Sequence, residues 1–333
     1  MGNKTTGDCV LLGMIAFLRF RCLALLLIAL FSLLDCRGAS GQEPIRVKVN
    51  LVDVSFTARD SAGALVTSLT RDDLEVFEDA VPQSIAFFAR SADLPLTLGL
   101  IVDASGSQSN FTKLHSQALE VFLKEVLGPR DRVFLVCFGN HLRLVSDFTP
   151  SGKALIEGMR GYSHDPSRFP EIGPGEEREL GTAFFDAIFY SVKEKLAGET
   201  GRRALLIFSD GEDNSSANDM MSTIEAAQEA DVPVFTIRYT EKEGGQLTAR
   251  NKYGIRVMDR VARETGGANI DAGSTDPHTY FRLIAEELRS SYQLAYYPTN
   301  PIKDDTFRKL VIRPKRGDLT VRAKTGYFAR IAR

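Results

Sequence analysis

The stretch LTLGLIVDASGS, residues 96–107, joins an apolar run to a short polar segment. Residues 96–102 contain no charged side chain and show no alternation of polar and apolar positions, which is typical of a strand buried on both faces. Similar runs occur at residues 133–138, 204–208 and 232–237. Strands of this kind form parallel sheets that helices cover on both sides, so the stretch predicts an α/β fold.

Amphipathic patterns lie between these apolar runs. In the first of them Leu114, Ala118, Val121 and Phe122 recur at helical spacing, and Gly128 with Pro129 follows as a stop signal. We expect helices at about residues 110–127, 182–196, 217–230, 257–264 and 276–290. Strands that alternate with helices of this length predict βαβ crossovers and a mostly parallel sheet.

The two ends of the mature chain have a different texture, with apolar residues at every second position. The alternation shifts by one residue at 51–52, which indicates a β-bulge. The apolar positions that alternate are Val52, Val54 and Phe56; Leu74 and Val76; Ile85 and Phe87; Tyr292, Leu294 and Tyr296; and Leu319, Val321 and Ala323. Each end offers only three or four strands, too few for an independent core. We therefore expect residues 44–92 and 291–329 to join in a small β-sandwich-like unit beside an α/β domain at residues 94–290.

The first 40 residues have the features of a secretory signal. Arg19 and Arg21 precede an apolar run at residues 22–34 that is interrupted only by Ser32, and small residues follow at 38–40. The run is shorter than the about 20 residues that a membrane span needs. We expect export to the periplasm or the extracellular space with cleavage near Ser40. An uncleaved membrane anchor is the alternative, because residues 10–18 are also largely apolar.

Composition and charge limit the possible partners. The 333 residues carry a formal net charge of −2, and no basic run interleaved with aromatic residues occurs, so nucleic acid is not an expected partner. Three of the four cysteines fall in the signal segment, which leaves Cys137 alone in the mature chain. Its place in an apolar run predicts a buried core thiol.

Five oxygen-bearing side chains follow the predicted strands in a way that suggests a site. Asp103, Ser105 and Ser107 come directly after the strand at residues 96–102, and Asp210 follows the strand at residues 204–209. Parallel strands end at one edge of a sheet, where ligands bind, so these side chains should be neighbours in space. Thr182 begins a predicted helix, where it either joins them or simply caps that helix.

Two carboxylates and three hydroxyls are hard oxygen ligands, which suit Mg²⁺, Mn²⁺ or Ca²⁺. The four histidines are scattered through the sequence and show no zinc spacing. Neutral hydroxyls leave a bound cation strongly electropositive, so a free coordination position would attract a carboxylate from outside. This is a chemistry of binding, for which no nucleophile is needed.

The order Asp103-x-Ser105-x-Ser107, Gly181-Thr182, Ser209-Asp210-Gly211 resembles the metal-ion-dependent adhesion site (MIDAS) of von Willebrand factor A (VWA) domains, over about residues 94–290. The resemblance implies a Rossmann-like sheet wrapped by helices, with the hydroxyls on the metal and the aspartates acting directly or through water. Residues 69–79, 296–300 and 307–309 resemble the exported bacterial "VWFA-related" proteins, whose ligand the resemblance does not supply. A Gly-, Pro- and acid-rich insert at residues 162–180 departs from the family pattern.

From these features we expect an exported, non-enzymatic binding or adhesion protein. Its divalent cation, Mg²⁺ first among the three, would bind an Asp or Glu of a protein partner, and Arg168, Glu171 and residues 176–179 of the insert would tune the docking surface. One alternative is a structural VWA module without metal-dependent binding.

Two enzymatic alternatives fit the motif less well. In a haloacid dehalogenase-like phosphatase Asp103 would be the nucleophile and Asp210 with Asp213 would hold Mg²⁺, but Ser105 stands where the general acid is required. A serine hydrolase would need the G-x-S-x-G elbow, which the segment around Ser105 and Ser107 lacks.

Overall fold

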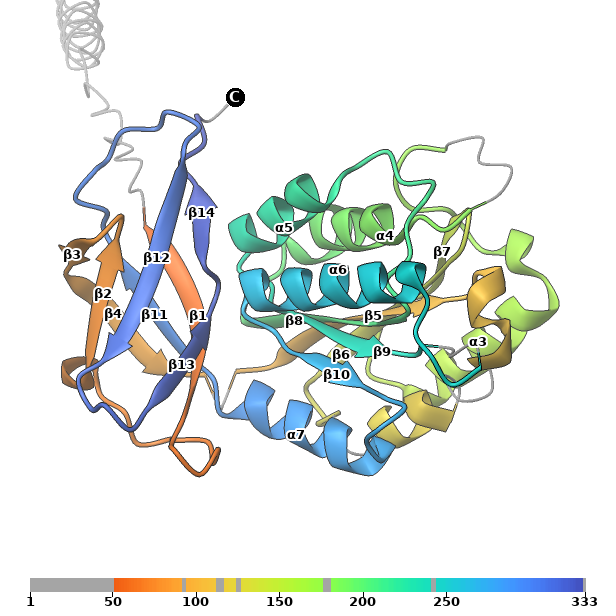
Figure 1. Cartoon of the computed structure of the whole chain (residues 1–333), viewed down its shortest axis with the longest axis horizontal. Helices are drawn as coiled ribbons and strands as arrows, with labels where there is room; N and C mark the ends of the chain where they lie inside the picture. The colour runs from red at the N-terminus through yellow and green to blue at the C-terminus, as the bar shows by residue number, and fades with distance from the viewer. Residues whose placement is uncertain are drawn as a thin grey trace, which may run out of the picture. The chain divides into compact units, whose positions relative to one another are not determined.

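The computed structural model of the chain describes residues 51–91, 94–111, 117–123, 127–175, 181–240 and 244–331 (Figure 1). The predicted signal at residues 1–40 and the start of the first β segment lie outside these ranges. Within the described ranges, no helix combines the length and apolarity that crossing a bilayer requires.

A six-stranded sheet forms the centre of the α/β domain, in the order β10-β9-β8-β5-β6-β7. The strands are β5 (Leu96–Asp103), β6 (Arg132–Phe138), β7 (Leu142–Thr149), β8 (Arg202–Ser209), β9 (Val234–Arg238) and β10 (Asn269–Asp271). All neighbours are parallel except β6 and β7. The order runs outward in both directions from β5, which is the doubly wound, Rossmann-like arrangement. The predicted α/β fold class is confirmed by this topology.

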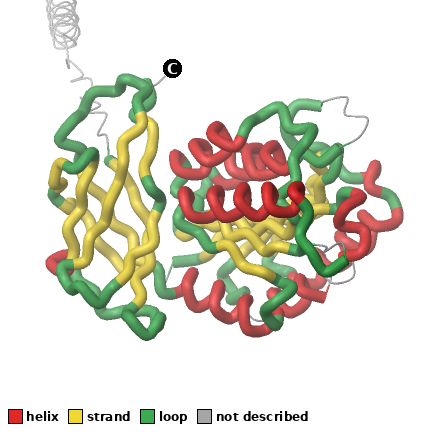
Figure 2. The backbone as a smooth tube through the Cα atoms, viewed as in Figure 1, coloured by secondary structure: helices red, strands yellow, loops and turns green. Residues whose placement is uncertain are grey.

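Helices cover both faces of the sheet (Figures 1 and 2), because successive strand residues point to opposite sides and are apolar on each. In β6, Val133, Leu135 and Cys137 enter one core, and the alternate residues Phe134, Val136 and Phe138 enter the other. The first core is closed by α3 (Gly152–His164), α7 (Pro277–Arg289) and the helical residues 117–123. The second is closed by α4 (Phe184–Tyr190) with its π-helical continuation (Ser191–Leu196), α5 (Met220–Glu229) and α6 (Ala249–Thr265). Cys137 is a buried core thiol, as predicted.

Some helix and strand assignments differ from the sequence prediction. Helix α6 begins at Ala249, well before the predicted residue 257, because Thr248 and Asn251 form a capping box at its N-terminus. The first half of the helix has few apolar residues, so the apolar periodicity did not reveal it. Strand β7 and helix α3 were not expected. Since α3 ends at His164, the insert predicted from residue 162 begins inside the last turn of a helix.

The flanking segments form two four-stranded antiparallel sheets, which confirms that they join in a sandwich-like unit. One sheet has the order β13-β1-β11-β4, and the other has the order β14-β12-β2-β3. Their strands are β1 (Val52–Arg59), β2 (Leu74–Glu78), β3 (Val81–Gln83), β4 (Ile85–Arg90), β11 (Tyr292–Tyr296), β12 (Phe307–Pro314), β13 (Thr320–Ala323) and β14 (Gly326–Phe328). Each sheet pairs strands from both flanks, and one apolar cluster lies between the sheets.

The face predicted for strand β4 is wrong in one position. Ile85 and Phe87 were expected to share the buried face, but Phe87 is 57% exposed. Phe88 enters the core instead, with its ring 5.5 Å from that of Tyr292. The pairing of β4 with β11 has a bulge between Ala295 and Tyr296, and a bulge reverses the side on which the following residues lie.

Two buried acidic residues of the α/β domain hold the strands of the sandwich-like unit. Asp231 accepts hydrogen bonds from the backbone N–H and the hydroxyl of Ser55, and its carboxylate lies 3.2 Å from Lys324 Nζ. Glu287, near the end of α7, pairs with Arg59 at 2.9 Å and with Arg322 at 2.7 Å. Both carboxylates are less than a tenth exposed, so little solvent reaches these contacts.

Candidate functional site

The predicted site lies where β5 and β8 end side by side. The two strands are parallel neighbours, with Val102 opposite Phe208, so Asp103 and Asp210 leave the sheet at the same edge. Strand order reverses between β5 and β8, and in open α/β sheets such a reversal leaves a crevice where ligands bind. The motif therefore lies at the point of the sheet where the strand order reverses.

Asp103 is fixed by hydrogen bonds to both of its carboxylate oxygens. It is 1% exposed, Oδ1 accepts from the Ser105 backbone N–H at 2.9 Å, and Oδ2 accepts from Ser209 Oγ at 2.5 Å. The turn formed in this way brings Ser105 Oγ within 3.1 Å of Ser107 Oγ. Neighbouring ligands of an octahedral Mg²⁺ are about 2.9 Å apart, since each lies about 2.0–2.1 Å from the ion. The two hydroxyls have a spacing that suits one cation.

Thr182 is held beside this edge by its backbone. Its N–H donates to Asn214 Oδ1 at 2.7 Å and its carbonyl accepts from the Asn214 N–H at 3.1 Å, which ties it to the loop after β8. The next residue, Ala183, donates to the carbonyl of Gly139 at the end of β6. Ala183, not Thr182, is the N-cap of α4, so the side chain of Thr182 is not the helix cap that the alternative interpretation required.

Gly181 explains why this loop can approach so closely. Its φ of +130° lies outside the range that other residues readily adopt, and an added Cβ would lie 2.6 Å from Ser215 Cβ. Glycine at residue 181 thus allows the Thr182 loop to contact the loop that follows Asp210.

Asp210 has its own set of contacts, two of which the sequence analysis missed. It is 4% exposed, Oδ1 accepts from the Glu212 N–H at 3.1 Å, and Oδ2 accepts from Gln108 Nε2 at 2.8 Å. Gly254 of α6 lies against its backbone, where an added Cβ would be 2.2 Å from the Asp210 carbonyl oxygen. A glycine inside a helical pattern is a signal of close approach that could have identified residue 254.

The site is electronegative and poorly hydrated. Burial raises the pKa of Asp103 from 3.8 to about 7; the hydrogen bonds from Ser105 and Ser209 lower it, and the nearby charge of Asp210 raises it. Burial and the charge of Asp210 also raise the pKa of Glu212, against the effect of Arg250 at 2.7 Å. Among the described residues, no three His, Cys, Asp or Glu side chains are arranged to hold a metal. A cation here would therefore need the hydroxyls.

We expect the metal-free protein to lose stability between about pH 4 and pH 7 through Asp103. Its folded pKa lies above its ordinary value, so the stabilising contribution is complete below about 3.8 and is lost as the pH rises through about 7. Asp103→Asn should remove this part of the pH dependence. Urea unfolding in chelator at several pH values measures it, and parallel pH profiles for both proteins would contradict the assignment.

A hollow of about 610 Å³ lies beside Ser105 and Gly181. Its wall includes Tyr162, Asp165 and Ser167, so the first part of the predicted insert does lie next to the motif. Hydrogen bonds hold other parts of the wall: His141 Nδ1 lies 2.9 Å from Glu171 Oε1, and Arg143 donates to the carbonyl of Phe169 at 3.1 Å. Arg168 stacks over the ring of Phe169, and residues 176–179 lie outside the described ranges.

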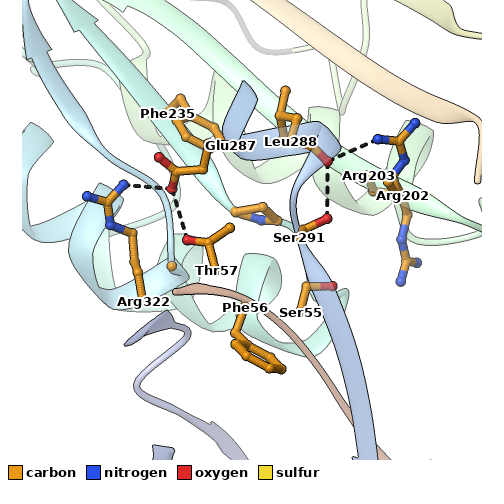
Figure 3. A pocket seen from close by; sticks show the side chains of 12 residues that line it. Ser55, Phe56, Thr57, Arg202, Arg203, Phe235, Glu287, Leu288, Ser291 and Arg322 are labelled. Carbon is orange, nitrogen blue, oxygen red and sulfur yellow. Dashed lines mark hydrogen bonds and ion pairs between the residues drawn. The ribbon is translucent and has the colours of Figure 1, made fainter. Parts of the chain in front are cut away.

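A second cavity, shown in Figure 3, does not compete as a binding site. It holds about 40 Å³, room for a few water molecules, and its acidic residue Glu287 is already bonded to Arg322 and Thr57. Arg202 donates to the carbonyl of Leu288 in the same wall. The polar groups in this cavity connect strands β1, β13 and β8 to helix α7.

No protein-family model and no curated protein matches the chain. Among solved structures, it is similar to an aerotolerance-related membrane protein from Bacteroides fragilis (15% identity, 58% of this chain and 98% of that chain, TM-score 0.43) and to the conserved hypothetical protein BatB from Bacteroides thetaiotaomicron (16%, 58% and 97%, TM-score 0.43). The VWA domain of SpRpn10 matches at 13% identity over 56% of this chain and 93% of that chain, with a TM-score of 0.37. Identities and scores this low indicate no function for this chain. Its α/β fold is established by its own strand order, and the MIDAS assignment stays a prediction.

Proposed function

We propose that this chain is a non-enzymatic VWA-type binding protein that uses a divalent cation, with Mg²⁺ as the first choice over Mn²⁺ and Ca²⁺. The cation would be held by Ser105, Ser107 and Thr182, together with Asp103 and Asp210. The observation that supports this most is the meeting of two buried carboxylates and a pair of hydroxyls at the β5–β8 edge. Without a cation, burial and the nearby charge of Asp210 raise the pKa of Asp103, and a divalent cation would offset this effect.

The contacts of the five residues suggest how they would divide the work. Each carboxylate oxygen of Asp103 and Asp210 accepts one hydrogen bond, which holds the two negatively charged groups in place. Each oxygen still has a lone pair that could bind the ion or a water on the ion. Ser105 and Ser107 offer neutral oxygens, which do not cancel the charge of the cation. When bound, the cation supplies a Lewis-acidic position for one external carboxylate.

The partner we propose is a protein that presents an Asp or Glu to this position. The hollow beside Ser105 would receive the residues next to that acidic side chain, with the first part of the insert as one wall. Losing the cation should remove binding almost wholly, because the partner's carboxylate would then be desolvated without a counter-charge. Export, with cleavage of residues 1–40 or their retention as an anchor, is part of the same proposal.

The enzymatic alternatives receive less support from the contacts. Asp213, the second metal ligand of the phosphatase model, accepts from the Phe185 N–H at the start of α4 and from Ser216 Oγ. A serine hydrolase would need a histidine at the hydroxyl of the nucleophilic serine, and Ser105 Oγ is instead paired with Ser107 Oγ. These residues therefore already have structural partners that catalysis would have to displace.

A peptide experiment tests the proposal without knowledge of the partner. Short random peptides that each carry one Glu should bind the full chain in Mg²⁺, and matched peptides with Gln in its place should bind far more weakly. Chelator or Asp103→Ala should remove the difference. Equal binding of Glu and Gln peptides, or binding that survives both treatments, would exclude a metal-bridged carboxylate.

A further inference from the structure

Gln108 is a buried amide next to the proposed site that the motif does not include. It is 1% exposed and lies in the short 3-10 helix at Gly106–Phe111 that follows the motif. Its Nε2 donates to Asp210 Oδ2 at 2.8 Å and to the carbonyl of Tyr239 at 3.3 Å. Two acceptors for the two amide hydrogens fix the orientation of the group.

The contact makes one half of a reciprocal arrangement. Gln108, from the loop after β5, holds the carboxylate at the end of β8, and Ser209, the last residue of β8, holds the carboxylate of Asp103 at the end of β5. The segment after β5 therefore positions Asp210, and the end of β8 positions Asp103. Both donors are neutral, so they orient the carboxylates without cancelling the negative charge that a cation needs, as a Lys or Arg would.

The other end of the amide is unsatisfied. Gln108 Oε1 is buried and accepts no hydrogen bond within the described residues. An unpaired buried acceptor costs free energy, and an apolar side chain of similar size would avoid that cost. Packing alone therefore does not account for a glutamine at residue 108.

We propose that Gln108 is a positioning residue of the cation site: its Nε2 orients Asp210, and its Oε1 accepts a hydrogen bond from a water or ligand group that enters with the cation. This inference rests on the proposed function, since it assumes that Asp210 serves a divalent cation. It adds a sixth residue to the five of the motif and assigns it an effect on affinity. Hydrogen-bonding partners of metal ligands commonly change affinity by about 10–100-fold.

Calorimetric titration of the full chain with Mg²⁺, and with Mn²⁺ as a second probe, tests the inference. Gln108→Met keeps the length of the side chain and removes the amide, so it should weaken Mg²⁺ binding by about 10–100-fold. Gln228→Met is the matched control, because Gln228 is 2% exposed and donates to the Glu264 carbonyl at 2.8 Å away from the site. It should lower the melting temperature and leave the Mg²⁺ affinity unchanged.

Gln108→Glu gives a readout that a merely structural role would not change. A second carboxylate at hydrogen-bond distance from Asp210 would share a proton with it, which the cation must displace, so Mg²⁺ affinity should depend more steeply on pH than in the wild type. This variant also carries the test if Gln108→Met does not fold. Wild-type protein that binds neither cation would overturn the proposed function and the inference with it. A second result would overturn the inference alone. In that case the wild-type protein binds Mg²⁺, Gln108→Met binds it as tightly as Gln228→Met does, and Gln108→Glu shows the same pH dependence of Mg²⁺ affinity as the wild type.

Discussion

Mg²⁺ should raise the melting temperature of the wild-type chain by several degrees, and Asp103→Ala should abolish the rise. A ligand at about 100 times its dissociation constant stabilises a fold by roughly 2.7 kcal/mol, provided that it does not bind the unfolded chain. Asp103 is the most deeply buried carboxylate of the site, and it fixes the turn that brings the Ser105 and Ser107 hydroxyls together. Its removal should therefore disrupt both the charge and the geometry that the cation needs.

A buried aspartate outside the site provides the control for this experiment. Asp186 is fully buried and accepts from the Ala217 and Asn218 backbone N–H groups, so Asp186→Ala should lower the melting temperature in the absence of metal. It should nevertheless retain the Mg²⁺ increment. Calorimetric scans with Mg²⁺ and with chelator measure both effects. The same increment in wild type and in Asp103→Ala would place any cation elsewhere.

Much of the α/β domain could be predicted because its strands are buried on both faces. Such strands have continuous apolar runs, and β5, β6, β8 and β9 all fall at the expected places. Strand β7 escaped prediction because it is an edge strand with a mixed burial pattern, which gives neither a continuous run nor a clean alternation. Helix α6 was predicted too short because a capping box, and no apolar periodicity, marks its first turn.

The candidate site could be predicted only as far as its motif. Asp103, Ser105 and Ser107 are adjacent in sequence, and Asp210 follows a recognisable strand, so the sheet topology brings them together. Gln108 and Gly254 act through contacts with Asp210 that depend on how the loop after β5 and helix α6 lie against the end of β8. No local pattern encodes the contact of Gln108, and Gly254 was missed because the predicted helix began only at residue 257. The face of Phe87 was missed for a similar reason, because the bulge that turns it outward is a property of the pairing with β11.

Glu287→Ala should destabilise the chain by roughly 3 kcal/mol, at the low end of the range for breaking a buried ion pair. Its side chain is 6% exposed and bonds to Arg59, Arg322 and Thr57, so its loss leaves two guanidinium groups without their carboxylate. The loss should lie at this low end because Arg59 and Arg322 are 26% and 38% exposed, so water can reach both guanidinium groups.

The neighbouring residue on the same helix is a matched control. Glu286 is 53% exposed and lies 4.0 Å from Arg282, so Glu286→Ala should change the free energy of unfolding by no more than about 0.5 kcal/mol. Urea unfolding followed by fluorescence and by circular dichroism measures both variants. Because Glu287 connects α7 to strands β1 and β13, its loss should also separate the transitions seen by the two probes, as happens when two parts of a chain unfold independently. Equal effects of the two substitutions would mean that the Glu287 contacts contribute no more than an exposed pair on the same helix.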